Sequence, residues 1–561
     1  MRAATLVCLL LLACGEPTPV DGATDAGLSD AGEPPLVPDR ICPGDPSCPD
    51  EGDGVLHAGA AAVAITPDLT RYETEWTDAN GDAAFLPLDG DTFVDRDGDG
   101  RFDGIWIAGF GNARAATGVH DDQWARALVL RQNQTTIAFV VLDVVGWFLD
   151  DADPIREMVS DLDIDYVLVS ATHVHEAFDT IGIWGPDLAT TGRDPAYIDY
   201  VQTRAARAIR DAHAALSPAH VQYASTRLRD QPGGTNRYVS DARDPHIIDD
   251  EIRILRFIDA AAGTTIATLV NMAAHPEYEG NKNTLLSSDY PHWLRDGVEN
   301  GVDGPDGTRI DGVGGVCVFV NGALGVQIGP GGVALRNWAD EPVARYTMEA
   351  AQTLGTQLAY FVLRALGDGG GSVVEETADL GFRSHRFLVP IENRRYHIAY
   401  LAGLFSRQLY DFDPDRPIRP GNIPSVLTEI AVVDVGAAQM ITAPGELDPA
   451  LFVGGYDGSY TPDGIPIVDT SAENPPDLSM APPPPYLRDL ARGDATQVWL
   501  LGLTQDFLGY FIPPFDYELH PTAPYIAEAA GDHYEETNSI GESGWPRIGR
   551  KIEELLLYRR P

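Results

Sequence analysis

The chain has 561 residues, of which 44% are hydrophobic, so it can bury a large core and global disorder is not expected. Lys and Arg number 39 against 84 Asp and Glu, which gives a formal net charge of −45. A chain this acidic would repel a phosphate backbone, which argues against nucleic acid as a partner and suits an exported protein or one that binds divalent cations.

The first predicted element is an export signal over residues 1–14. One Arg precedes an apolar run from Ala3 to Ala13, which is too short to span a bilayer, and Cys14 follows. The letters LLAC resemble a bacterial lipobox, in which the Cys is lipidated after cleavage; the alternative is an ordinary signal peptide with a chance Cys. We expect a protein anchored to the bacterial cell envelope, at the outer membrane, through lipidated Cys14, or else secreted.

Residues 15–57 are rich in Pro, Gly, Asp and Ala and lack an apolar period, which predicts a flexible tether. Within it, Cys42 and Cys48 could close a small disulfide loop in an exported protein. Cys317 lies in the apolar run VCVFV and is predicted to be a buried thiol. No Cys pair has zinc-finger spacing, so a metal in this chain would use His, carboxylate and Tyr ligands.

An insertion over 77–104 has the composition of a calcium loop. Alternate oxygen ligands are followed by Gly100 at the position of a sharp turn, and Arg101 could offer its backbone carbonyl. The candidate calcium ligands are Asp95, Asp97, Asp99, Arg101 and Asp103. The twelfth position of an EF-hand holds Glu but is Trp106 here, so this is not a standard EF-hand. The alternative is a solvated acidic loop.

The remainder, 58–561, is predicted to be one large α/β domain of mixed β-sheets flanked by helices, because apolar β-branched runs alternate with helical stretches. The predicted strands are 135–148, 165–171, 264–275, 315–323 and 428–446. One helix is predicted to begin at Pro195 behind Asp194 as its N-cap. A second is predicted over 341–367, closed by Gly367.

Two imidazoles and a carboxylate follow the strand 165–171 in the stretch SATHVHE. Residues i and i+2 of a strand point the same way, so His173 and His175 could face one cavity at its carboxyl end, where α/β sheets place ligands. Neutral imidazole is a common zinc ligand. Taken alone, the pattern also fits one hydrogen-bonded core His and one surface His.

Two other apolar runs end in the same manner. His275 follows one in VNMAAHPEYEG, and Glu446 follows another in MITAPGEL. A catalytic zinc takes about three protein ligands and keeps a position for water, which two His and one Glu would serve. Each residue also has a simpler interpretation, a capping His before Pro and a turn carboxylate.

Short motifs in a fixed order give the chain a family resemblance. They are GFGNARAATGVHDDQWARALVL, VLVSATHVH, NRYVSDARDPHIIDDEIRILRF, NMAAHPEYEGNKNTLLSSDY, FVNGALG, ITAPGEL, LGYFIPPFDY and HYEETNSIG. Together they resemble the catalytic domain of the neutral (non-lysosomal) ceramidases, from about residue 58 to about residue 545. The resemblance implies a single zinc-hydrolase domain. No C-terminal immunoglobulin-like domain is expected, since the chain stops soon after the last motif.

The resemblance also implies roles for individual residues. The implied zinc ligands are His173, His275, Glu446 and Tyr510. The implied catalytic residues are His175, which contacts substrate or water, and Arg237 and Tyr534, which stabilise the oxyanion. From the residues alone, each Tyr could equally be a half-buried packing residue and Arg237 a surface salt bridge.

Two departures from the family pattern bear on substrate. The turn after the His-x-His carries Glu176 and Asp179 where the family has small residues, and GALGVQIGP lacks the Ser proposed in the family as a nucleophile. Water activated by zinc would not need that Ser. The leading hypothesis is a zinc-dependent amidase of an N-acyl lipid such as ceramide. The others are a zinc hydrolase of another amide or ester, and a non-catalytic, calcium-stabilised surface lipoprotein. The oligomeric state is not predicted.

Overall fold

The computed structural model describes residues 36–46 and 48–559. The chain divides into two units, Met1–Leu36 and Val37–Pro561, and the second is the domain described below. The predicted signal peptide, with Cys14, and residues 15–35 of the predicted tether lie outside the described residues. In the described part of the chain, none of the helices combines the length and apolar character needed to cross a bilayer.

The larger of two main sheets has nine strands in the order β15-β11-β10-β9-β2-β6-β7-β8, with β16 paired to β9. They are β2 (His57–Ala64), β6 (Trp124–Gln132), β7 (Thr135–Leu142), β8 (Tyr166–Ala171), β9 (Ser217–Arg227), β10 (Glu251–Asp259), β11 (Thr265–Met272), β15 (Val316–Asn321) and β16 (Val373–Glu375). The pairs β7/β8 and β11/β15 are parallel, and the other pairs are antiparallel. Every residue of β7 and β8 is buried, as their continuous apolar runs predict.

The smaller sheet has five strands in the order β1-β17-β18-β19-β21. They are β1 (Arg40–Cys42), β17 (Leu380–Pro390), β18 (Ser425–Val435), β19 (Ala438–Thr442) and β21 (Gln497–Leu501). The prediction of one strand over 428–446 is wrong. The chain reverses at Gly436, whose φ of 54° suits a residue without Cβ, and β18 pairs antiparallel with β19.

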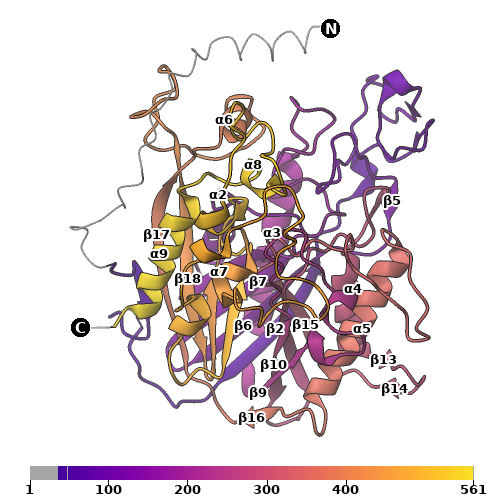
Figure 1. The fold of residues 1–561 in the computed structure, drawn as a ribbon. Helices are drawn as coiled ribbons and strands as arrows, with labels where there is room; N and C mark the ends of the chain where they lie inside the picture. Colours follow the sequence, from indigo (N-terminus) through magenta and orange to yellow (C-terminus); the bar gives the residue numbers. More distant parts are fainter. Residues whose placement is uncertain (1–35, 47, 560–561) are drawn as a thin grey trace. The chain divides into compact units, whose positions relative to one another are not determined.

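The two sheets share one core, which includes Phe139 and Phe257 from the larger sheet and Phe382 and Trp499 from the smaller. Helices α2 (Leu149–Met158), α3 (Pro195–Ala214), α4 (Asp289–Asn300) and α5 (Met348–Leu366) cover the other face of the larger sheet. Helix α9 (Gly544–Leu557) packs on β17 and β18 (Figure 1). The mixed α/β architecture predicted from the sequence is confirmed.

Short elements complete the domain. The helices are α6 (Arg394–Leu401), α7 (Pro449–Val453) and α8 (Tyr534–Thr537). The two-stranded ladders are β3 (Trp76–Thr77) with β4 (Thr92–Phe93), β5 (Gly118–Val119) with β12 (Leu285–Leu286), β13 (Val302–Asp303) with β14 (Arg309–Ile310), and β20 (Glu446–Leu447) with β22 (Tyr510–Phe511).

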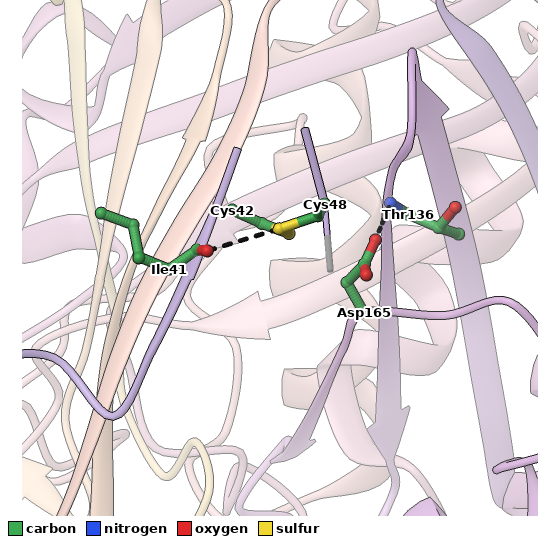
Figure 2. The surroundings of a disulfide bond; sticks show 5 residues. All are labelled: Ile41, Cys42, Cys48, Thr136 and Asp165. Atoms are coloured by element: carbon green, nitrogen blue, oxygen red, sulfur yellow. Dashed lines mark hydrogen bonds between the residues drawn. A yellow bond between two sulfur atoms is a disulfide. The ribbon is translucent and has the colours of Figure 1, made fainter. Parts of the chain in front are cut away.

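The folded domain begins earlier than the tether prediction allows. Strand β1 lies within the predicted tether, and Cys42, Cys48 and Leu56 are buried in the core between the sheets. A disulfide joins Cys42 to Cys48 (Figure 2), and Cys317 is a buried free thiol, as predicted. Asp165 lies close to the disulfide, but two paired sulfurs are not thiolates, so this group is not a metal site.

Helix α3 begins at Pro195, as predicted. The side chain of its N-cap, Asp194, accepts hydrogen bonds from the Ala196 amide (2.8 Å) and the Tyr72 hydroxyl (2.6 Å). Helix α5 ends at Gly367 as predicted but begins only at Met348, because the Thr347 side chain caps it there by accepting from the Ala350 amide.

The Asp194 cap gives a first testable prediction. Asp194→Ala leaves an amide of the first turn without its acceptor and removes the acceptor of the Tyr72 hydroxyl. We expect the free energy of unfolding, measured by urea denaturation, to fall by about 1–2 kcal/mol. Asp199→Ala, an exposed change on the same helix, should shift it by less than about 0.5 kcal/mol. Equal losses in the two variants would contradict the capping role.

Candidate metal centre

Four chain segments bring the predicted ligands together. His173 and His175 follow β8, and His275 follows β11, while Glu446 and Tyr510 open β20 and β22 and lie opposite each other in that parallel ladder. Asn321, at the end of β15, explains why the ends of β8 and β11 lie together. Its amide donates to the carbonyls of Thr172 (3.1 Å) and Ala274 (2.8 Å), the residues just before His173 and His275.

The ligand atoms converge on one point. His173 Nε2 lies 3.2 Å from His175 Nε2 and 3.3 Å from Glu446 Oε2, and His275 Nε2 lies 3.1 Å from the same carboxylate oxygen. All four side chains are buried. Ligands at zinc–ligand distances of 2.0–2.1 Å in a tetrahedron stand about 3.3 Å apart, so this spacing fits one metal ion.

Backbone carbonyls fix the tautomers of two of the histidines. His173 Nδ1 lies 2.5 Å from the Val145 carbonyl oxygen, and His275 Nδ1 lies 3.3 Å from that of Gln327. A carbonyl can only accept, so each Nδ1 carries the proton and each Nε2 presents a lone pair to the cluster. This is the arrangement typical of metal-ligating histidines.

The surroundings of Glu446 and His175 set the charge of each side chain at neutral pH. Burial opposes its charge, but His173 and His275 hold the pKa of Glu446 well below its usual value. Burial, with the neighbouring His173 and His275, holds the pKa of His175 well below the usual imidazole value. At neutral pH Glu446 is therefore ionised, the form that binds a metal, and His175 is neutral, the form that can accept a proton.

The two tyrosines lie along one side of this cluster. Tyr510 is buried, its ring stands 6.5 Å from that of His275, and burial with Glu446 raises the pKa of its hydroxyl well above the usual value. Tyr534 opens α8, is 47% exposed, and its ring stands 6.0 Å from Tyr510. Tyr510 thus lies beside the ligands and Tyr534 between Tyr510 and solvent, which is compatible with their predicted roles.

Arg237 is not brought to the cluster in the same way. Its guanidinium donates to the carbonyls of Arg336 and Asn337, each at 3.1 Å, and to the Asp340 carboxylate at 3.4 Å. These bonds direct it to the loop 336–340. A contact between Arg237 and a substrate stays a prediction.

Arg114 and Glu277, which are buried beside the histidines, were not predicted as part of the site. Arg114 donates to the carbonyls of Ala108 and His175 and so holds the backbone of the His-x-His. Glu277 Oε2 lies 3.2 Å from His175 Nδ1, and Glu176 is fully buried, 3.8 Å from Arg114, with neither oxygen hydrogen-bonded. Burial raises the pKa of Glu277 to about 7. The sequence signal was the spacing of Glu277, two residues after His275.

The acidic insertion forms two groups of close carboxylates. Asp97, Asp99 and Asp103 make one, and Asp95 and Asp97 with Glu73 make the other. Glu73 lies outside the predicted loop, is buried, and accepts from the amides of Arg96 (3.2 Å) and Asp103 (2.8 Å). It offers a carboxylate that the loop lacks at its twelfth position. Because Glu73 precedes the insertion in the sequence, the pattern of Asp residues in the loop did not predict it as a ligand.

Comparison with known proteins agrees with this architecture. Residues 95–304 match the family model for the N-terminal part of neutral/alkaline non-lysosomal ceramidase. Neutral ceramidase from Pseudomonas aeruginosa superposes with a TM-score of 0.55 at 16% identity, over 90% of this chain and 74% of that one. A ceramidase complexed with C2 superposes with a TM-score of 0.57 at 15% identity, over 90% and 75%. No curated protein matches.

The structural likeness, at this identity, bears on the fold, and the family match bears on the segment that carries His173, His175 and His275. The two findings agree with the order of motifs in the sequence. The chain thus matches the neutral/alkaline non-lysosomal ceramidase family over residues 95–304 and has the ceramidase fold over nine tenths of its length.

Proposed function

We propose that this chain is an exported zinc-dependent hydrolase, anchored through Cys14, that cleaves the amide bond of an N-acyl lipid. Ceramide is the leading candidate substrate, with fatty acid and sphingosine as products. The observation that carries the proposal is the convergence of His173, His275 and Glu446 on one buried point. The match to the ceramidase family supports the choice of reaction.

The donor set suits zinc, which takes imidazole nitrogen and carboxylate oxygen in nearly tetrahedral sites. His173, His275 and Glu446 would hold it, with Tyr510 beside them. When bound, zinc supplies a Lewis acid that lowers the pKa of a coordinated water and polarises a carbonyl.

The residues around the metal have separate tasks in this proposal. His175, neutral and buried, takes a proton at Nε2 and returns it to the leaving amine. The Tyr534 hydroxyl, at the exposed end of the row of rings, donates to the carbonyl oxygen as negative charge develops there. No Ser stands at the position where the family's proposed nucleophile would lie, so attack by water is favoured over an acyl-enzyme.

The test is an assay of fatty-acid release from an N-acylsphingosine with the full chain in detergent. We expect release that is lost on zinc chelation and restored by adding zinc. Zinc-loaded, folded protein that releases nothing from this lipid would exclude ceramide. Protein that neither binds zinc nor hydrolyses any acyl amide would favour the non-catalytic surface lipoprotein.

A second candidate keeps the metal site and changes the substrate to another amide or an ester. It is favoured by Glu176 and Glu277, which bring buried carboxylates to within reach of His175 and Arg114. Buried polar groups beside a site favour a substrate that carries polar groups able to pair with them there. An N-acyl amino acid or amine panel, run beside the lipid, separates the two candidates by kcat/KM.

We also propose that the insertion binds calcium structurally, through Asp95, Asp97, Asp99, the Arg101 carbonyl and Asp103, with Glu73 as a further ligand. Adding millimolar Ca²⁺ to chelator-treated protein is expected to raise the melting temperature by several degrees, since a ligand that binds only the folded state stabilises it. Glu73→Gln should remove most of this shift and Glu75→Gln, an exposed change two residues away, should not. A shift of the same size in Glu73→Gln would exclude Glu73 as a ligand.

A further inference from the structure

The three histidines of the metal centre differ in the group that faces Nδ1 of the ring. His173 and His275 each turn Nδ1 to a backbone carbonyl. His175 Nδ1 instead faces a carboxylate oxygen, Glu277 Oε2, at 3.2 Å. The angles at this contact are not those of a hydrogen bond, so His175 Nδ1 has no hydrogen-bond partner among the described residues, and Glu277 Oε1 has none.

The surroundings leave Glu277 as the acceptor for this nitrogen. Both side chains are more than nine tenths buried, so water is largely excluded. The nearest cation, Arg114, can only donate, and it is engaged with the carbonyls of Ala108 and His175. Phe110 packs edge-on against the His175 ring at 5.2 Å.

Gly109 makes room for the ring in this position. A Cβ at residue 109 would stand 2.3 Å from His175 Cγ, and the φ of 101° there is one that glycine adopts readily. The ring is therefore confined between Gly109, Phe110 and the other two histidines, with Nδ1 held 3.2 Å from Glu277 Oε2.

We infer that Glu277 is the positioning residue of His175, accepting its Nδ1–H so that the Nε2 lone pair faces the cluster beside His173 Nε2, 3.2 Å away. This inference rests on the proposed function, and it concerns the one histidine among these three whose Nδ1 does not face a backbone carbonyl. With the proton on Nε2 instead, an N–H would point at the place of the metal, and His175 could neither ligate it nor accept a proton from water. Carboxylate–histidine pairs hold metal-site imidazoles in this way.

The inference is tested with Glu277→Gln, which removes the charge, and Glu277→Leu, which also removes the acceptor. We expect kcat to fall about tenfold in the first and about a hundredfold in the second, with KM changed by less than about threefold. Glu279→Gln is the matched control, a buried glutamate of the same loop that bonds Ser287 and Asn283, and should keep kcat within about twofold.

A second readout does not depend on activity. In zinc-loaded protein labelled with ¹⁵N-histidine, with His175 assigned from a His175→Asn variant, the wild type should show the proton on Nδ1. Glu277→Leu should move it to Nε2 or leave a mixture. An unchanged tautomer in Glu277→Leu, or an equal loss of kcat in Glu279→Gln, would overturn the inference. Absence of amidase activity in the wild type would instead overturn the proposed function, and the tautomer measurement would still decide the role of Glu277.

Discussion

Glu446→Gln is expected to lower kcat for amide hydrolysis by at least about a thousandfold and to weaken zinc binding strongly. The Glu446 carboxylate is the one negative charge shared by the two carbonyl-oriented histidines, at 3.3 Å from His173 and 3.1 Å from His275. A neutral amide keeps the shape but not the charge that offsets a divalent cation. Since the side chain is buried, water cannot replace that charge.

Two measurements check this prediction: initial rates on an N-acylsphingosine and zinc affinity by competition with a chelator. His173→Ala should behave in the same manner, because it removes a ligand whose tautomer is already set. His57→Ala changes a histidine at the start of β2 whose ring contacts the Val55 carbonyl, and it should keep both values within about twofold. A Glu446→Gln variant with wild-type zinc affinity would exclude this residue from the metal centre.

The metal centre could be found from the sequence because its ligands follow apolar runs. His173 and His275 come directly after strands whose period and burial are easy to predict, and a strand end is where ligands gather in α/β sheets. The sequence could not show which strand ends meet. That depends on Asn321 at the end of the edge strand β15, whose amide bonds the residue before His173, after the opposite edge strand β8, and the residue before His275, after β11.

Residues that reach a site from another segment of the chain were harder to predict. Glu277 reaches His175 and Glu73 reaches the acidic loop from segments far along the chain or outside the motif. The β18/β19 reversal was missed because Gly436 lies in an otherwise continuous apolar run, and β1 was missed because its composition is that of a linker. For Glu277, Glu73 and β1 a long-range contact overrides the local pattern, whereas the β18/β19 reversal is a tight local turn.

One buried cation, Arg243, joins the two chain segments that carry Tyr510 and Tyr534. Arg243 is 3% exposed and binds three carboxylates: Asp516 Oδ2 at 2.8 Å, Glu535 Oε2 at 3.0 Å and Glu536 Oε1 at 2.8 Å. The glutamates directly follow Tyr534 in α8, and Asp516 lies six residues after Tyr510. Arg243 therefore joins the two segments that place these tyrosines beside the metal ligands.

Arg243→Met should consequently affect stability and catalysis together. It removes the cation but leaves the carboxylates buried, and breaking a buried ion pair on one side typically costs about 3–5 kcal/mol. We expect a loss of that size in the free energy of unfolding and, in the protein that remains folded, a kcat lowered at least about tenfold because Tyr510 and Tyr534 lose their common support. Arg207→Met, which breaks the exposed pair with Asp211, should cost less than about 0.5 kcal/mol. Urea denaturation and initial rates measured on both variants decide the matter, and an Arg243→Met variant as stable as Arg207→Met would show that the three carboxylates find other partners.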